Sequence, residues 1–187
     1  MNLLLNTIGF FTLLFTLLLF LVFTVKLVLF LFKQKDFPRW TLTATILGMA
    51  LFSGIFVYIQ YFFTFSAINR EYMQEGPALL LSPTGKYTAN AYYEPYGGTG
   101  SSGGVNVWIE IKNNEDQAVK IVYYADAKSR FSMEWLDEET LSIVNQDEKP
   151  NTDRSVELHV AKEIYHENGL ACKSFLMKNE YEKCYQN

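Results

Sequence analysis

Two long apolar runs near the amino-terminal end constrain this chain more than any other feature of its sequence. The first covers about residues 7–32 and contains one charged side chain, Lys26, whereas the second covers about residues 41–65 and contains none. At about 1.5 Å per residue, a helix over either run is long enough to cross a hydrocarbon core of about 30 Å. The sequence therefore predicts a transmembrane hairpin of two helices within residues 1–69.

A cleavable signal peptide is the alternative interpretation of the first run. Such a peptide has a basic segment before a shorter apolar stretch, followed by a small-residue cleavage site. The residues before the first run carry no basic side chain. Lys26 lies near one end of the run, where its long side chain can extend to the lipid headgroups. A membrane span is therefore the prediction.

The short connection between the runs predicts the orientation of the hairpin. It contains Lys33, Lys35 and Arg39, and Pro38 ends helix propagation there. Basic residues concentrate in cytoplasmic loops, so this loop is predicted to be cytoplasmic and both termini extracytoplasmic, in a two-span protein of the cell membrane. Arg70, just after the second run, weakens the asymmetry, and a cytoplasmic carboxyl-terminal domain is the alternative.

Charge divides the chain at the same place as hydropathy. Residues 1–69 carry a net charge of +3 and residues 70–187 a net charge of -7, which gives the -4 of the whole chain. An acidic domain lacks the basic surface by which proteins hold nucleic acid, so no nucleic-acid partner is expected. The lipid bilayer is the first predicted partner.

Small residues lie on neighbouring turns of the second apolar run. Gly48, Ala50, Ser53 and Gly54 could let another helix approach closely. Packing against the first helix of the same chain is favoured over homodimerisation, because the short loop already tethers the two helices.

The pattern after residue 70 changes to short β-rich segments separated by turn residues. Ser82-Pro83-Thr84-Gly85 is typical of a tight turn, and Asn113-Asn114-Glu115-Asp116 of another. The prediction for residues 70–187 is a small antiparallel β-rich domain of the α+β class, with helical turns over 161–167 and 174–184 covering one face. Strands are expected over residues 78–81, 86–93, 105–111, 118–124, 130–136, 140–144 and 155–160.

The two cysteines, Cys172 and Cys184, both fall in the segment predicted to lie outside the membrane. A disulfide is the natural interpretation in that compartment. A zinc site with His159 and His166 is the rival, but the spacing matches no metal-binding signature. No metal and no cofactor are therefore expected.

A glycine-rich segment over residues 97–104 is the most conspicuous low-complexity stretch. It lacks the Lys and the following helix of a phosphate-binding loop, so a flexible strand connection is favoured. Tyrosines provide contact area at low entropic cost, so a binding rim beside this loop is predicted, with packing within the sheet as the alternative for each tyrosine. The rim residues are Tyr92, Tyr93, Tyr96, Gly97, Gly98, Gly100, Gly103 and Gly104.

The acidic run Asp137-Glu138-Glu139 could supply calcium ligands or paired carboxylates, but it lacks the alternate spacing of a calcium loop. A water-facing hairpin tip is the simpler interpretation. Ser82 and the other serines have no nucleophile-elbow context. The sequence therefore does not predict an enzyme.

Two sequence elements carry a family resemblance. Residues 82–87 read Ser-Pro-x-Gly-Lys-Tyr, and residues 134–140 read Glu-Trp-x-Asp-x-x-Thr. Together they resemble a family of small uncharacterised membrane-anchored proteins of Gram-positive spore-forming bacteria, which has a domain of unknown function; the similarity covers about residues 60–160. The resemblance implies membrane attachment and a sheet domain, and it implies no reaction and no catalytic residue.

These observations predict a membrane-anchored, non-enzymatic binding module displayed outside the cytoplasmic membrane. Its expected partner is a protein or a cell-envelope component. One alternative is an accessory subunit of a membrane complex that works through its transmembrane hairpin. The other is an envelope hydrolase that uses a pair of carboxyl groups.

Overall fold

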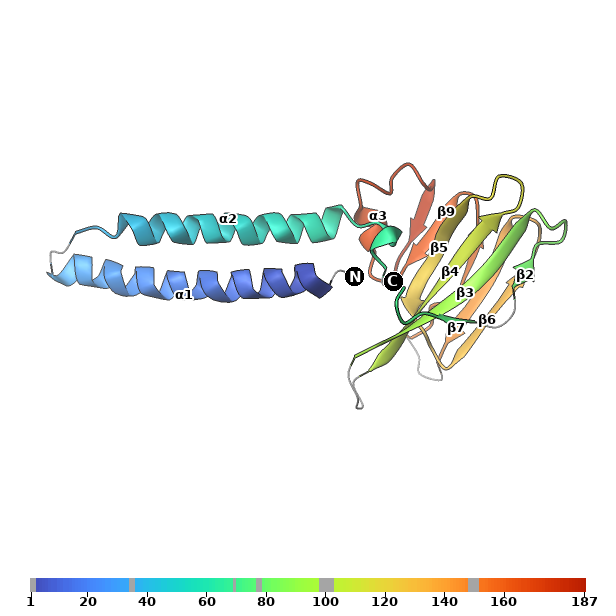
Figure 1. Ribbon diagram of the computed structural model, residues 1–187, viewed down its shortest axis with the longest axis horizontal. Coiled ribbons are helices and arrows are strands. Elements are labelled where there is room, and N and C mark those ends of the chain that lie inside the picture. The colour runs from blue at the N-terminus through green and yellow to red at the C-terminus, as the bar shows by residue number, and fades with distance from the viewer. Residues whose placement is uncertain (1–2, 34–35, 69, 77–78, 98–102, 148–151) are drawn as a thin grey trace. The chain divides into compact units, whose positions relative to one another are not determined.

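The computed structural model describes residues 3–33, 36–68, 70–76, 79–97, 103–147 and 152–187 (Figure 1). The chain forms two compact units, residues 1–62 and residues 63–187. The first unit therefore ends at residue 62, seven residues before the predicted boundary at residue 69. The difference arises because residues 63–68 pack with the second unit.

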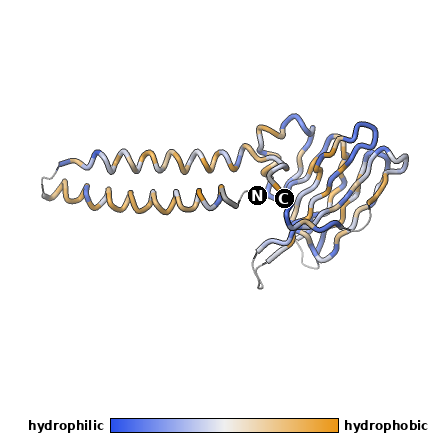
Figure 2. The backbone as a smooth tube through the Cα atoms, viewed as in Figure 1, coloured by the Kyte–Doolittle hydropathy of each residue, from blue (hydrophilic) through white to orange (hydrophobic). Residues whose placement is uncertain are grey.

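The first unit is a hairpin of helices α1 (Leu3–Lys33) and α2 (Arg39–Tyr61). Apolar residues continue along both helices (Figure 2). Both helices are long and apolar enough to span a membrane, and only 6% of the most apolar window of each is buried within the protein. A core helix of a water-soluble domain would bury most of such a surface.

The two helices of the hairpin approach closely at Gly48. A Cβ atom added there would lie 2.6 Å from Oγ1 of Thr16 on α1, whereas a Cβ added at Gly54 would meet nothing within 4 Å. Thr16 is buried at this contact, and its hydroxyl donates to the carbonyl oxygen of Thr12 at 2.7 Å. Gly48 is therefore the small residue that α1 requires, and Gly54 is open.

The second unit is a β-sandwich of two sheets (Figure 1). The larger sheet has the order β1-β3-β4-β5-β9-β10, with β2 also paired to β3, and the smaller sheet has the order β6-β7-β8. A core between the sheets contains Ala89, Val107 and Tyr123 from one and Leu141 and Leu158 from the other. The strands are β1 (Gln74–Glu75), β2 (Leu80–Leu81), β3 (Tyr87–Tyr96), β4 (Gly104–Asn113), β5 (Val119–Asp126), β6 (Arg130–Trp135), β7 (Thr140–Gln146), β8 (Val156–His159), β9 (Glu163–His166) and β10 (Lys183–Tyr185).

The structure corrects two predictions for this unit. The larger sheet is mixed rather than antiparallel, because β9 runs parallel to both β5 and β10. Residues 161–167 and 174–184 are not helical: they contain β9 and β10, and the only helix described beyond residue 68 is α3 (Leu170–Lys173). The pairing with β5 determines the conformation of β9, so the local sequence propensity of these residues does not predict the strand.

A second core covers the outer face of the larger sheet. It contains Trp108, Ile121 and Ile164 from the strands, Phe65 from the residues that follow α2, and Met177 from the carboxyl-terminal segment. The layers that cover the larger sheet are thus the second sheet on one face and these two irregular segments on the other.

Candidate functional site

The two family-like sequence elements meet in space, although about 55 residues separate them. The hydroxyl of Ser82 donates to Oε1 of Glu138 at 2.5 Å, and the backbone N–H of Thr84 donates to Oε2 of the same carboxylate at 2.7 Å. The Ser82 oxygen also accepts from the N–H of Tyr87 at 2.9 Å. Gly85 closes the turn with a φ of 78°. We call this contact between residues 82–87 and 134–140 the motif junction.

Further contacts surround the motif junction. Oε1 of Glu139 lies 3.2 Å from Nζ of Lys86, and Oε2 lies 3.1 Å from Nε2 of His159. The indole N–H of Trp135 donates to the carbonyl oxygen of Leu80 at 3.2 Å, which ties the smaller sheet to β2. The acidic run forms the tip of the β6–β7 hairpin, as predicted, and Asp137 is exposed there; Glu138 and Glu139 in addition bind the neighbouring turn and strand. The sequence contains no local signal for this pairing, because the partners are distant along the chain.

Hydrogen bonds lower the pKa values of two of these acidic groups. The hydroxyl of Ser82 holds the pKa of Glu138 below its ordinary value, and the N–H of Glu139 does the same for the pKa of Asp137. Such carboxylates stay ionised at neutral pH and are weak bases and poor proton donors. The arrangement is therefore suited to holding two turns in place rather than to moving a proton.

Exposed leucines lie beside the motif junction. Leu81 precedes Ser82 and is 64% exposed, and Leu136, two residues before Glu138, is 52% exposed. Leu79, directly before β2, is 63% exposed. These three exposed leucines lie in or next to the segments whose hydrogen bonds form the motif junction.

A cross-strand aromatic ladder crosses the outer face of the larger sheet. Tyr92, Trp108, Tyr124 and His166 lie at paired positions of β3, β4, β5 and β9. The rings of Tyr92 and Trp108 stack with centroids 5.6 Å apart, and those of Tyr124 and His166 with centroids 5.2 Å apart. The second core therefore packs on a continuous row of aromatic rings across the larger sheet.

His166 is buried under this core. The ring of Phe63 meets it edge-on at 4.8 Å, and among the described residues neither imidazole nitrogen has a hydrogen-bond partner. Burial lowers the pKa of His166 to about 4, so the ring is neutral at physiological pH. Sequence reasoning placed His166 only in a rival zinc site and missed this packing role.

The structure divides the predicted binding rim between the two faces of the sheet. Tyr92 lies on the outer face, whereas its neighbour Tyr93 faces the sandwich core against Phe131, with ring centroids 5.7 Å apart. Tyr96 lies across from Gly104, and its hydroxyl donates to Asp126 at 2.9 Å. Gly97 has a φ of 88° and Gly103 is exposed, while Gly98 and Gly100 lie outside the described residues.

The predicted cysteine pair lies at disulfide distance. The Cα atoms of Cys172 and Cys184 are 5.4 Å apart, and the bridge joins α3 to β10. His159 contacts Glu139 and His166 is packed among aromatic rings, so the two histidines make other contacts. No group of three potential metal ligands is found in the part of the chain that the structure describes.

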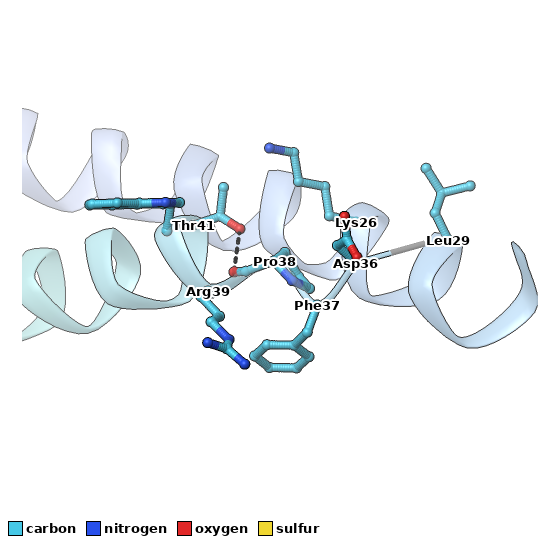
Figure 3. Close-up of a pocket in the computed structure, with 8 residues that line it drawn as sticks. Lys26, Leu29, Asp36, Phe37, Pro38, Arg39 and Thr41 are labelled. Atoms are coloured by element: carbon cyan, nitrogen blue, oxygen red, sulfur yellow. Dashed lines mark hydrogen bonds between the residues drawn. The ribbon is translucent and has the colours of Figure 1, made fainter. Parts of the chain in front are cut away.

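The loop of the hairpin borders a shallow hollow (Figure 3). Arg39 begins α2, and Figure 3 shows its side chain extending beside Phe37. The hydroxyl of Thr41 donates to the carbonyl oxygen of Pro38 at 3.0 Å, which fixes the first turn of α2. Of the other residues predicted to set the orientation, Lys33 ends α1 and Lys35 lies outside the described residues.

These features define a class of protein that joins a helical hairpin, long and apolar enough to span a membrane, to a mixed-sheet β-sandwich. The chain belongs to a family of unknown function, DUF5412, whose profile matches residues 33–168. The matched region includes α2 and the motif junction and ends before Cys172 and Cys184. Neither a curated protein nor a solved structure is significantly similar to the chain.

Proposed function

We propose that this protein is a membrane-anchored, non-enzymatic binding module whose sandwich domain faces the outside of the cell. The hairpin supports the anchoring, because only 6% of the most apolar window of each helix is buried within the protein and water would not solvate the remaining apolar side chains favourably. The geometry of the sandwich domain is well suited to presenting a rigid surface to a binding partner.

The observation that carries the binding proposal is the exposure of Leu79, Leu81 and Leu136 beside the motif junction. Exposed leucines next to a hydrogen-bonded turn can be buried by a partner at little cost in conformational entropy. The partner that fits is another envelope protein, which would cover the leucines and leave the charged side chains of the motif junction in water.

The pKa values of the acidic groups support a non-enzymatic role over a hydrolase. A hydrolase with a carboxylate pair needs one carboxyl group whose pKa is raised. Hydrogen bonds lower the pKa values of Asp137, Glu138 and Asp153 instead. Replacing the hairpin with an unrelated two-span hairpin tests the accessory-subunit alternative, since a function carried by the sandwich domain survives that replacement.

Photo-crosslinking on intact cells tests the binding surface. A photoreactive residue at Thr84 should capture a discrete partner, and the Leu81→Asp, Leu136→Asp double variant should reduce that product at least tenfold. Tyr72→Asp, which places the same charge at another exposed position, is the matched control and should leave the product unchanged. An undiminished product in the leucine variant would contradict the proposed surface.

A further inference from the structure

The disulfide closes a segment, residues 172–184, that holds two apolar side chains outward. Within this disulfide-closed segment, Ser174 and Met177 are buried, and the N–H of Glu180 donates to the carbonyl oxygen of Met177 at 2.9 Å. Between the two buried residues, Phe175 and Leu176 are 55% and 53% exposed. Phe175 and Leu176 thus form a small apolar tip, which the buried residues Ser174 and Met177 hold in place.

Hydrogen bonds attach this tip to the residues that follow α2. The hydroxyl of Ser174 donates to the carbonyl oxygen of Phe63 at 2.6 Å, and its oxygen accepts from the N–H of Leu176 at 3.2 Å. Phe63 is two residues beyond Tyr61, where α2 ends, so the chain keeps their Cα atoms within about 7 Å of each other. The tip is therefore held beside Phe63, two positions along the chain from the last residue of α2.

Basic side chains flank the apolar tip. Lys173 and Lys178 are exposed on either side of it, and Nζ of Lys178 lies 5.1 Å from the ring centroid of Phe175. The acidic residues of the segment lie further along, where Glu182 pairs with Lys162 at 3.7 Å. An aromatic and an aliphatic side chain between two lysines match a lipid interface, where rings enter the acyl boundary and lysines reach anionic headgroups.

We propose that Phe175 and Leu176 insert into the lipid leaflet from which α2 emerges, with Lys173 and Lys178 on anionic headgroups. This inference rests on the proposed membrane anchoring of the hairpin. The sandwich domain is then held against the bilayer at two points, the end of α2 and the disulfide-closed segment. The disulfide has a specific role in this arrangement, because it keeps the tip formed while the domain moves at the surface.

Tryptophan quenching in the full-length protein tests the proposal. In a Trp40→Phe background, Phe175→Trp is reconstituted into vesicles of phosphatidylcholine and phosphatidylglycerol with brominated acyl chains. Its added emission should be quenched at least twofold more than that of the control Leu136→Trp, at the motif junction. Trp108 and Trp135 contribute equally to both proteins. Leu176→Trp provides a second probe if Phe175→Trp does not fold.

Two outcomes separate this inference from the anchoring proposal. Quenching of both tip probes no greater than that of Leu136→Trp, in protein that resists alkaline extraction, overturns the inference and leaves the anchoring intact. Release of the protein by alkaline extraction overturns the anchoring itself. The Lys173→Glu, Lys178→Glu variant should lose most of the additional quenching, and no change in that variant would contradict the role of the lysines.

Discussion

At the scale of single residues, a few buried polar groups connect distant parts of the sandwich domain. Ser82 is the clearest example, because its hydroxyl accepts from the N–H of Tyr87 and donates to the carboxylate of Glu138. Ser82→Ala removes the partner of the buried Tyr87 N–H and should lower the free energy of unfolding by about 1–3 kcal/mol. Urea unfolding of the detergent-solubilised protein measures this, with the exposed Ser132→Ala as a control expected to change stability by about 0.5 kcal/mol or less. Equal effects of the two changes would contradict a structural role for the junction.

His166 makes stability depend on pH in a defined direction. Its folded pKa is about 4 against 6.5 in an unperturbed chain, so between these values the unfolded chain binds a proton that the folded chain does not. The free energy of unfolding should therefore fall as the pH drops from 7 to 5, by up to about 1.4 kcal/mol per pH unit for this group. His166→Phe keeps a ring against Phe63 and Tyr124 and should flatten that dependence. Parallel curves for the two proteins over this range would show that His166 is not buried.

At the scale of elements, strand predictions succeeded where alternation was visible in the sequence. Val105 to Ile111 alternates clearly, and β4 covers it. Ile164, Tyr165 and His166 are all buried, with Tyr165 toward the sandwich core and its two neighbours toward the outer core. The sequence therefore shows no alternation of apolar and polar residues, and the predicted helix was wrong. The motif junction escaped prediction for a related reason, since a hydrogen bond across 56 positions has no local signature.

The contact between α1 and α2 depends on one glycine. Gly48→Leu should force the helices apart at Thr16, by about 1–2 Å given how interaxial distance varies with side-chain size, whereas Gly54→Leu faces open space and should not. Spin labels at the exposed positions Phe11 and Val57 would report the change as a longer inter-label distance in vesicles. The same distance in both variants would mean that the helices do not pack at Gly48.

The disulfide-closed segment contributes stability through one cross-link. Closing a loop of this length should raise the free energy of unfolding by about 2–4 kcal/mol, chiefly by restricting the unfolded chain. Adding a reductant should therefore lower the melting temperature of the wild-type protein but leave that of the Cys172→Ser, Cys184→Ser variant unchanged. If reductant does not change the melting temperature of the wild-type protein, the bond does not form.

At the scale of the whole molecule, hydropathy and charge divide the chain as the structure does. The apolar hairpin carries the net positive charge, and the acidic sandwich domain contains the disulfide pair. Disulfide bonds persist in oxidising compartments. Both features support the proposed orientation, because basic loops are generally retained in the cytoplasm and disulfides generally persist outside it. The two arguments are independent, since one concerns insertion and the other redox chemistry.

Thiol labelling on intact cells tests that orientation directly. Single cysteines are placed at Asp36, in the loop of the hairpin, and at Glu115, in the exposed turn between β4 and β5, while the disulfide pair does not react. A membrane-impermeant maleimide should label Glu115→Cys in intact cells, and Asp36→Cys only after permeabilisation, because a loop bearing Lys33, Lys35 and Arg39 is retained inside. The reverse pattern would place the sandwich domain in the cytoplasm, where cysteine thiols are generally kept reduced. Labelling of both sites in intact cells would contradict a hairpin that crosses the membrane twice, since its loop and its domain would then share one side.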